Sequence, residues 1–424
     1  MNILILGSGG REHAFAYKIA KSPLCTRLFV ATGNAGTGQI ATNVAMNIMD
    51  FKQVGDFSYQ YKIDMLVVGS EAPLVEGIAD YFADQPQLQH IKVIGAKKAG
   101  AMLEGSKDFA KQFMLKYNIP TATYRTFTPS TLAEGLAYIA QHSLPVVLKA
   151  DGLAAGKGVI IAETTEHAQA TLQEMLAGKF GEASSRVVIE QFLSGIELSV
   201  FILTDGISYK LLPSAKDYKR VGEGDKGLNT GGMGAVSPVP FADEAFMQKV
   251  KDKIITPTLQ GLQAEKIDYK GFIFFGLIKV GDEPYVIEYN ARMGDPETEV
   301  VLPRIETDLV ALLDAAAQQK LAAFGELQIN PQTATTVMLV SGGYPEDFEK
   351  DKVIIGLEEI KDAIAFHAGT KLLDNKVVSS GGRVIALTAF GATLQEALQK
   401  SNAAANTVNF DKKYYRKDIG FDLI

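Results

Sequence analysis

The first hundred residues alternate short apolar runs with polar stretches of helical periodicity. Helical patterns begin near Arg11 and near Leu74. The apolar runs that predict strands are residues 2–6, 27–32, 64–70 and 91–95. This alternation is typical of repeated βα units, which form a parallel sheet and bind ligands beyond the carboxyl ends of their strands. We therefore expect one functional edge, made by the loops 7–13, 32–38 and 69–75.

Beyond residue 101 the pattern changes to mixed strands and helices. A helix over 107–117 and an extended segment before Pro120 predict a hinge, because the residue before a proline avoids helical geometry. Residues 121–192 then contain a strand–helix–strand pattern in which a glycine-rich loop, 151–158, joins two strands. A second mixed layer is predicted by a glycine-rich stretch at 221–235, an amphipathic helix at 243–263 and strands at 271–280 and 284–290.

These patterns predict a multidomain protein of mixed α/β and α+β class. The N-terminal domain is a parallel βα, Rossmann-like unit, the core has two lobes, and a C-terminal α+β domain follows Asn330 and Pro331. A chain of 424 residues is long enough for about three such domains. Their predicted limits are 1–101, 102–327 and 328–424, with 121–192 as a mobile lobe of the core.

Composition narrows the class of protein. The formal charge is -7 and no dense basic run is present, which argues against a nucleic-acid partner. Cys25 is the only cysteine, so an internal disulfide is excluded, and five scattered histidines argue against a histidine-based metal site. No apolar run approaches the roughly 18 residues that span a bilayer. We therefore expect a cytoplasmic protein that has no membrane contact.

The segment EYNARMGDPET, residues 288–298, contains the side chains with the clearest chemistry. Glu288 and Asn290 lie two apart at the end of a predicted strand, so both oxygens leave the same face and suit one hard cation such as Mg²⁺. Arg292 adds a permanent forked cation for a phosphate or a carboxylate. The alternative is a polar turn after a strand, in which Arg292 pairs with Glu297.

The loop GSGGREH, residues 7–13, follows the first predicted strand but lacks a complete dinucleotide fingerprint. Glu12 stands where G-x-G-x-x-G requires its third glycine, and no acidic residue ends the second predicted strand. Free N–H groups at a helix start still suit a phosphate. We therefore expect phosphate binding rather than nicotinamide binding, with a structural βα turn as the alternative.

The loop DGLAAGKG, residues 151–158, resembles a P-loop only superficially, because its glycines are too close and a strand follows it. It is predicted to be a flap that carries Lys157, with Lys149 on the preceding strand, and both lysines suit nucleotide phosphates. An exposed hairpin is the alternative. The segment 188–199 offers an extended backbone to an adenine edge, or is a plain strand–turn–strand.

Together these blocks resemble the ATP-grasp superfamily, in which two α+β units grip ATP between them. Over the whole chain, and in the same order, they resemble one family within it, phosphoribosylamine–glycine ligase (glycinamide ribonucleotide synthetase). The blocks that carry this resemblance are GSGGREH, GNAGT, SEAPLV, EGSK, LKADGLAAGKGV, DYKRVGEGDKGLNTGGMGA, EYNARMGDPETEVVLPR, FHAGT and YYRKDIG.

The resemblance implies an ATP-dependent carboxylate–amine ligase of purine biosynthesis that uses Mg²⁺ or Mn²⁺. ATP would phosphorylate glycine, and the amine of 5-phosphoribosylamine would attack the glycyl phosphate to give glycinamide ribonucleotide, ADP and phosphate. Such chemistry depends on positioning and charge stabilisation, which fits a chain without an evident nucleophilic triad. The partners would be these small molecules, and the chain would be a monomer or a weak homodimer.

The resemblance also assigns residues to roles. Catalytic roles fall to Arg292, Lys157 and Asp295. ATP contacts fall to Lys107, Lys149, Lys157, Glu190, Gln191, Phe192, Leu193 and Glu197. The phosphoribosyl group would be bound by Gly9, Gly10, Arg11, Asn34, Thr37, Glu71 and Pro73. Glycine would be bound by Asp217, Lys219, Asn229, Asp295 and Pro296. The metal ligands would be Glu288 and Asn290.

Some positions depart from the usual spelling of the family, namely Ser70, Tyr218, Ala291 and Met293. Tyr218, where histidine is common, is the most consequential because it lies beside the expected glycine pocket. The strand 271–280 also lacks an acidic residue, so one strand carboxylate remains for metal where many ATP-grasp enzymes have two. Two other hypotheses stay open: an ATP-grasp ligase for a different acid and amine, and a nucleotide-binding or oxidoreductase module.

Overall fold

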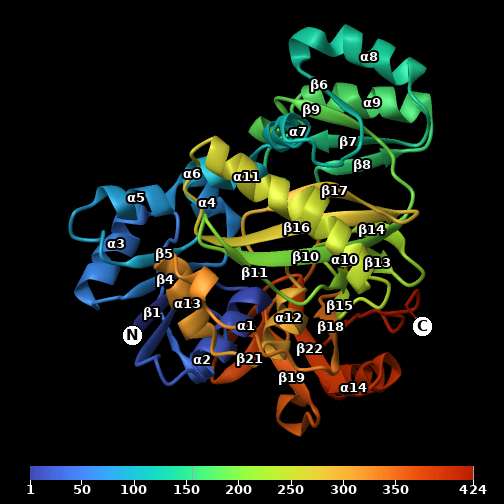
Figure 1. The fold of residues 1–424 in the computed structure, drawn as a ribbon. Helices are drawn as coiled ribbons and strands as arrows, with labels where there is room; N and C mark the ends of the chain where they lie inside the picture. The colour runs from blue at the N-terminus through green and yellow to red at the C-terminus, as the bar shows by residue number, and fades with distance from the viewer. Residues whose placement is uncertain (155, 424) are drawn as a thin grey trace.

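The N-terminal sheet consists of parallel strands, as the sequence predicts. The computed structural model describes residues 1–154 and 156–423 (Figure 1). In spatial order the strands are β3 (Thr42–Asn43), β2 (Arg27–Thr32), β1 (Asn2–Gly7), β4 (Met65–Val68) and β5 (Lys92–Ile94). The helices are α1 (Gly10–Ile19), α2 (Thr37–Ile40), α3 (Phe51–Gln60), α4 (Glu71–Glu76) and α5 (Ile78–Asp84).

Gly77 divides the helix that the sequence predicts from Leu74 onward. Its φ is +92°, a left-handed conformation that glycine adopts at little cost, and it ends α4 before α5 begins. The chain then passes through α6 (Lys98–Gly105) and α7 (Lys107–Lys116) into a lobe that projects from the body (Figure 1).

The projecting lobe has a hydrophobic core of its own. Its antiparallel sheet has the order β6 (Tyr124–Phe127), β9 (Val187–Gln191), β7 (Val146–Ala150) and β8 (Val159–Ala162). Its helices are α8 (Leu132–Gln141) and α9 (Thr165–Leu176), and the loop between β7 and β8 is the predicted flap. These elements lie within the segment 121–192, whose limits and mobility as a lobe stay predictions.

A second antiparallel sheet forms the centre of the body. Its order is β11 (Tyr209–Leu211), β10 (Ile196–Thr204), β16 (Gly271–Val280) and β17 (Glu283–Asn290). The helix expected over 243–263 is present, but a π-helical turn, Lys251–Ile255, interrupts it between α10 (Glu244–Val250) and α11 (Thr256–Ala264). Pro257 explains this turn, because it lacks the N–H that an α-helix needs.

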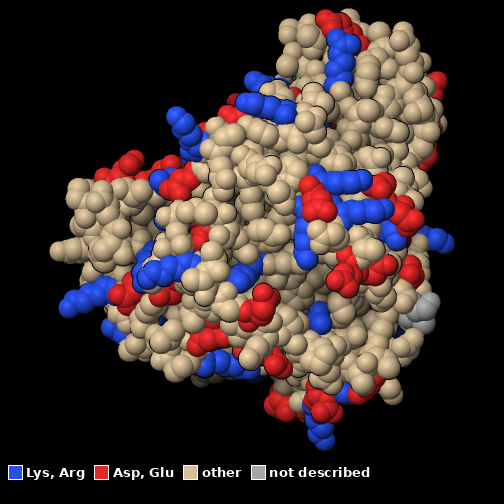
Figure 2. Space-filling model, in the orientation of Figure 1, with Lys and Arg blue, Asp and Glu red and all other residues tan. Residues whose placement is uncertain are grey.

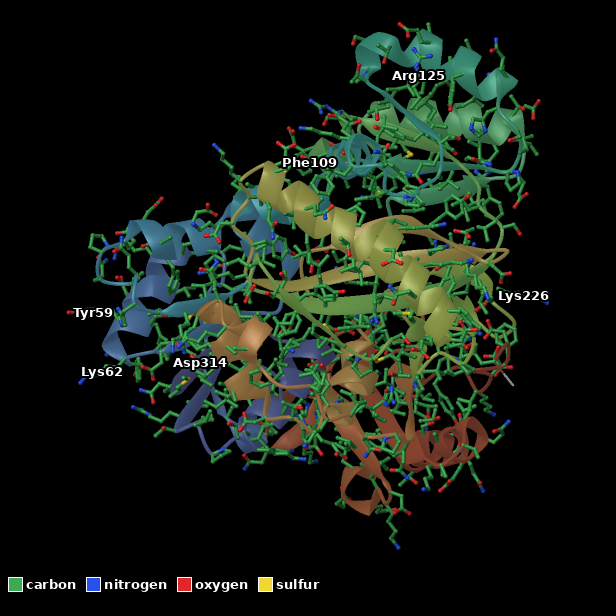
Figure 3. All side chains as sticks on the ribbon, viewed as in Figure 1. Tyr59, Lys62, Phe109, Arg125, Lys226 and Asp314 are labelled. Carbon is green, nitrogen blue, oxygen red and sulfur yellow. The ribbon has the colours of Figure 1, made fainter. Side chains whose placement is uncertain are left out.

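A third sheet combines strands from the predicted core and from the predicted C-terminal domain. Its order is β12 (Lys216–Asp217), β15 (Gly234–Ser237), β18 (Thr333–Val340), β22 (Arg383–Gly391) and β19 (Ala363–His367). Two hairpins accompany it: β13 (Arg220–Gly222) with β14 (Lys226–Asn229), and β20 (Thr370–Leu373) with β21 (Lys376–Ser379). Lys226 projects outward from the first hairpin (Figure 3).

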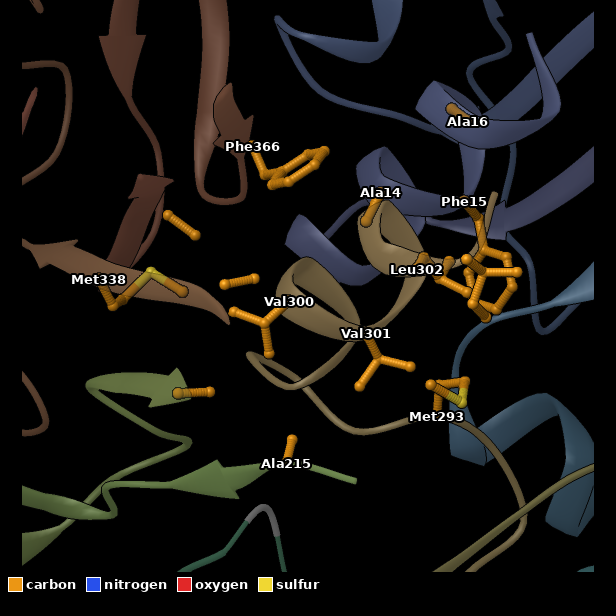
Figure 4. Packing of buried hydrophobic residues seen from close by; sticks show 14 of the residues in the cluster. Ala14, Phe15, Ala16, Ala215, Met293, Val300, Val301, Leu302, Met338 and Phe366 are labelled. Carbon is orange, nitrogen blue, oxygen red and sulfur yellow. The ribbon is translucent and has the colours of Figure 1, made fainter. Parts of the chain in front are cut away.

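Helix α12 (Thr298–Arg304) lies at the centre of the largest core. Val300, Val301 and Leu302 of α12 pack among residues of α1 and of the third sheet, including Phe15 and Met338 (Figure 4). The remaining helices are α13 (Leu309–Ala317) and α14 (Leu394–Thr407). Since α12 directly follows the segment 288–298, this packing holds the segment between the N-terminal and C-terminal sheets.

The surface carries both signs of charge. On the face shown in Figure 2, lysine and arginine side chains are interleaved with aspartate and glutamate. Among the helices that the structure describes, none combines the length and hydrophobicity that a bilayer span requires.

Candidate active site

Glu288 of β17 lies opposite Gly276 of β16. A Cβ atom at position 276 would come within 2.9 Å of Glu288 Cγ, so a larger residue would displace the carboxylate. The position of β16 that faces Glu288 thus provides space rather than a second acidic ligand.

Four cations surround the Glu288 carboxylate. Burial opposes its ionisation, but the charges of Lys219, Lys149, Lys107 and Arg292 outweigh burial and lower the pKa of Glu288. Lys149, Lys219 and Arg292 each have a further carboxylate partner, but the cations converge on one region, and such a group suits a polyphosphate. The fold brings together residues that lie far apart in the sequence.

The side-chain oxygens of Glu288 and Asn290 suit a hard cation. The register pairs Gly276 with Glu288 and Phe274 with Asn290, so both side chains leave the same face of β17. Within the described residues, no group of three or more histidine, cysteine, aspartate or glutamate side chains is placed to hold a metal. An ionised carboxylate and an amide oxygen fit Mg²⁺, which takes its other ligands from phosphates and water.

Glu190 bridges two buried lysines. Its carboxylate oxygens lie 3.0 Å from Lys149 Nζ and 3.0 Å from Lys111 Nζ. Lys149 also donates to the backbone oxygen of Ile287, and Lys111 donates to Thr121 Oγ1 at 2.8 Å. Burial lowers the pKa of Lys111 to about 8, although Glu190 opposes this shift. The Glu190 side chain therefore orients lysines, and a contact with adenine would fall to the neighbouring backbone.

The predicted adenine segment begins where sheet pairing ends. Gln191 is the last paired residue of β9, and Phe192 and Leu193 follow it. Phe192 is exposed, which leaves its ring available to a ligand. Glu197, the predicted ribose contact, lies 3.1 Å from Lys219 Nζ, so the expected ribose and glycine residues meet.

The flap is attached at its base to the start of α7. Lys107 Nζ donates to the backbone oxygen of Gly152 at 3.1 Å, and Ser106 Oγ donates to Asp151 Oδ1 at 2.9 Å. Burial lowers the pKa of Lys107, although nearby Glu288 opposes this. Lys157 is exposed, as a residue that closes over a ligand must be before binding.

Arg292 is held by two glutamates of the N-terminal half. Its Nη2 lies 2.6 Å from Glu104 Oε1, and its Nε lies 3.4 Å from Glu71 Oε2. The alternative in which Arg292 pairs with Glu297 is therefore wrong. Burial disfavours the charged form of Glu71, but Arg292 and Arg11 outweigh it and lower the pKa of Glu71 to about 2. Glu71 thus remains ionised at neutral pH.

Glu12 fills the space above the first glycine loop. Its Oε2 accepts a 2.6 Å hydrogen bond from the Gly9 N–H, and its Oε1 accepts one of 2.9 Å from Arg11 Nε. A Cβ atom at Gly7 or at Gly69 would collide with the Glu12 side chain. The departure from the dinucleotide fingerprint therefore has a structural cause, and the Gly9 N–H already has an acceptor.

Asn34 organises the second loop through internal hydrogen bonds. Its Nδ2 donates to the Ser8 oxygen at 2.9 Å and to the His367 oxygen at 2.7 Å, while its Oδ1 accepts from the Gly36 and Thr37 amides. The hydroxyl of Thr37 is likewise engaged within the loop. These two predicted substrate contacts shape the loop and join it to the C-terminal domain. Pro73 is buried in α4, and Gly10 begins α1.

The residues that are predicted to bind the substrate glycine fall into two groups. Asp217 and Lys219 are close, and burial raises the pKa of Asp217 although Lys219 opposes this. Asn229 ends β14 in the adjacent hairpin. Pro296 packs on Gly232 of the GGMG turn, whose φ is +121°.

Asp295 faces a different neighbour. Its Oδ1 lies 2.9 Å from Arg383 Nη2, and its Oδ2 lies 3.5 Å from the Arg11 amide nitrogen. It therefore lies where the N-terminal loop, the segment 288–298 and the C-terminal sheet meet.

Sequence reasoning assigned no role to several residues at this site. Glu297 accepts a 3.0 Å hydrogen bond from Ser199, and burial together with Asp217 raises its pKa to about 7. Glu104 lies in the EGSK block and Glu297 lies in the segment 288–298, so a sequence motif could have pointed to each of them. No sequence motif pointed to Lys111 or Arg383, because their partners are distant in sequence.

Sequence comparison matches three parts of the chain to the domains of one protein family. Profiles for the N domain, the ATP-grasp (A) domain and the C domain of phosphoribosylglycinamide synthetase match residues 1–104, 105–298 and 334–422. The chain belongs to the phosphoribosylglycinamide synthetase family. Proteins named phosphoribosylamine–glycine ligase from Pseudomonas aeruginosa and Pasteurella multocida are each 45% identical over 100% of this chain and 98% of their own length.

Solved structures agree with this assignment. The phosphoribosylamine–glycine ligase of Thermotoga maritima is 34% identical, with a TM-score of 0.85 over 99% of this chain and 100% of that chain. The biotin carboxylase domain of a Hydrogenobacter thermophilus 2-oxoglutarate carboxylase is 16% identical, with a TM-score of 0.72 over 99% and 92% of the two chains, and shows the shared fold alone. The predicted family and fold class are confirmed. The domain limits and the individual site roles stay predictions.

Proposed function

We propose that this chain joins glycine to 5-phosphoribosylamine with ATP, forming glycinamide ribonucleotide, ADP and phosphate in purine biosynthesis. Glycyl phosphate is the intermediate. The observation that carries the proposal is the group of cations around Glu288. Lys149 of the projecting lobe contacts the Ile287 oxygen beside it, and Arg292 contacts Glu71 of the N-terminal domain. Full-length similarity to ligases of this name supports the choice of substrates.

Each group of residues has a distinct task in this proposal. Lys107 and Lys149 bind ATP phosphates, and Lys157 closes over them with the flap. Arg292 stabilises the charge that develops as the phosphoryl group passes to the glycine carboxylate. Asp217 binds the ammonium group of glycine. Mg²⁺ or Mn²⁺, when held by Glu288 and Asn290, supplies charge neutralisation at the phosphates.

The N-terminal edge receives the second substrate. Gly9, Gly10, Arg11, Glu71 and Pro73 line the loops that would bind the phosphoribosyl group, and Asn34 and Thr37 hold the second loop in shape. Arg11 donates to the Met293 oxygen at 3.1 Å, which places this edge beside Arg292. The amine of 5-phosphoribosylamine would thus approach the acyl phosphate from the N-terminal side, with closure of the flap excluding water.

Substrate dependence of ADP release tests the proposal. Protein incubated with ATP, Mg²⁺, glycine and phosphoribosylamine, made in place from ribose 5-phosphate and ammonia, should release ADP only when all components are present. Mass spectrometry should detect glycinamide ribonucleotide. ADP release that ignored glycine would contradict the proposal, and a screen of other amino acids would reveal a ligase for a different acid. Tight NADH binding would instead favour an oxidoreductase module.

We also propose a cytoplasmic protein that is a monomer or a weak homodimer. The family is metabolic, and its substrates are small polar molecules. Sedimentation velocity over a hundredfold range of concentration distinguishes these states: a sedimentation coefficient that stays at the dimer value on dilution would contradict the proposed oligomeric state.

A further inference from the structure

Residues Arg416 to Asp422, here called the C-terminal segment, pack against the strand that carries the predicted glycine contacts. Tyr218 Oη donates a 2.7 Å hydrogen bond to Asp422 Oδ1, and Lys216 Nζ lies 3.1 Å from Asp422 Oδ2. Side chains alternate along extended backbone, so the face that binds Asp422 is opposite the face that presents Asp217. Tyr218, the departure from the family spelling, therefore points away from the pocket.

Arg416 attaches the C-terminal segment to the neighbouring hairpin. Its side chain is fully buried, and its Nη1 lies 2.6 Å from Asp225 Oδ1 and donates to the Arg220 oxygen at 3.1 Å. Its Nε lies 2.8 Å from Asp418 Oδ1, and its guanidinium carbon lies 5.4 Å from the centre of the Tyr218 ring. A buried arginine with two carboxylates and an aromatic face fixes the relative position of these elements.

The attachment reaches the backbone of the pocket itself. Asp418 Oδ2 accepts a 2.7 Å hydrogen bond from the Gly224 N–H at the turn of the β13–β14 hairpin. The hairpin ends at Asn229, and the next residue, Thr230, donates its N–H to the Lys219 oxygen at 2.8 Å. One network therefore runs from the C-terminal segment to both backbone stretches that carry the predicted glycine contacts.

We propose that the C-terminal segment positions the glycine pocket and thereby sets the affinity for glycine. It acts through Tyr218 and Asp225 on the backbone of Asp217, Lys219 and Asn229. The identity of the amino acid rests on the function proposed above, whereas the positioning itself does not. The lysines predicted to bind ATP phosphates belong to α7, β7 and the flap, so we expect the segment to act mainly on glycine. Its one route to the ATP site among the described residues is the pair of Lys219 with Glu197, the predicted ribose contact.

Steady-state kinetics of Tyr218→Phe and Asp422→Ala test this role. Each change removes the hydrogen bond between the two side chains, and we expect the KM for glycine to rise about 3- to 10-fold. The KM for ATP and kcat should change by less than about twofold. The double variant should resemble Asp422→Ala, because both changes act on the same contact. Unchanged glycine KM values in both single variants would overturn the proposal.

Tyr415→Phe is the matched control. The Tyr415 hydroxyl lies at the same end of the chain, but it donates to Asn406 of α14 and, among the described residues, forms no hydrogen bond with the pocket strand. Its glycine KM should equal that of the parent protein. A rise as large as that of Tyr218→Phe, or a general loss of kcat and Tm in all variants, would show a merely structural effect and overturn the proposal.

Hydrogen exchange provides a readout that needs no substrate. In Tyr218→Phe the amides of residues 216–230 should exchange faster, while those of β7 should be unaffected. The same exchange rate over 216–230 as in the parent protein would overturn the positioning role. Failure of the parent protein to use glycine would count against the proposed function only, since the exchange result does not depend on it.

Discussion

The guanidinium group of Arg292 uses separate nitrogens for separate partners. Nη2 faces Glu104, Nε faces Glu71, and Nη1 donates to the Met293 oxygen at 3.2 Å. A planar fork held in this way keeps one orientation, which an ammonium group on a flexible stem does not. The Arg292 side chain is therefore already aligned before negative charge develops beside it.

Replacing Arg292 with lysine should lower kcat more than it weakens ATP binding. A single ammonium cannot satisfy Glu104 and Glu71 together, so alignment is lost although the charge remains; we expect a decrease in kcat of about 10- to 100-fold. ATP dissociation constants should change by less than about threefold. Arg125→Lys, at a surface pair 2.9 Å from Glu134, is the control. Equal losses in rate and ATP affinity would contradict this role.

At the scale of elements, local pattern predicted most of the secondary structure. β2 and β16 have the expected limits, because the pattern of apolar runs is a local property. The split at Gly77 and the π-helical turn before Pro257 were missed, since each depends on one residue within a helical pattern. Glycine loops and the segment 288–298 were visible as motifs. Contacts such as Lys111 with Glu190 were not, because they join segments that meet only in the folded chain.

Replacing Lys157 with alanine should weaken nucleotide binding. The flap joins β7 to β8, and contacts with α7 anchor it at its base through Asp151 and Gly152. Lys157 is exposed and gains a partner when ATP binds, so we expect the dissociation constant of Lys157→Ala to rise about 3- to 10-fold. Isothermal titration with a non-hydrolysable ATP analogue measures this. Lys179→Ala removes an exposed lysine of the same lobe, paired with Glu174, and should have no effect. An unchanged constant in Lys157→Ala would support the exposed-hairpin alternative.

At the scale of the whole molecule, two histidines connect the N-terminal sheet region with the C-terminal sheet. His13 Nδ1 accepts a 2.8 Å hydrogen bond from the His367 amide, and Asn34 binds the His367 oxygen at 2.7 Å. Burial, with a contribution from His367, lowers the pKa of His13 to about 3, and burial lowers the pKa of His367 to about 4. Both rings are neutral in the folded protein at pH values where the unfolded chain binds protons.

Stability should therefore decrease as pH falls below about 6.5, the ordinary pKa of histidine. Between that value and pH 4 the unfolded state binds more protons than the folded state. Each histidine should therefore lower the free energy of unfolding by roughly 2 kcal/mol at pH 5. Denaturant unfolding at pH 7.5 and pH 5 measures this. His367→Gln should show a smaller loss over this range. An equal loss in variant and parent would contradict the assignment.

The sheet that joins β15 to β18 also determines how the chain can be divided. A break at the predicted boundary between 327 and 328 would leave β18 with an open edge, where β15 now pairs from Gly234 to Ser237. Exposed sheet edges of this kind promote aggregation, because their backbone groups can pair with another chain. The segment 328–424 is thus a poor candidate for exchange between relatives as a separate unit. Chimeras should instead transfer β12, β15 and the C-terminal strands together.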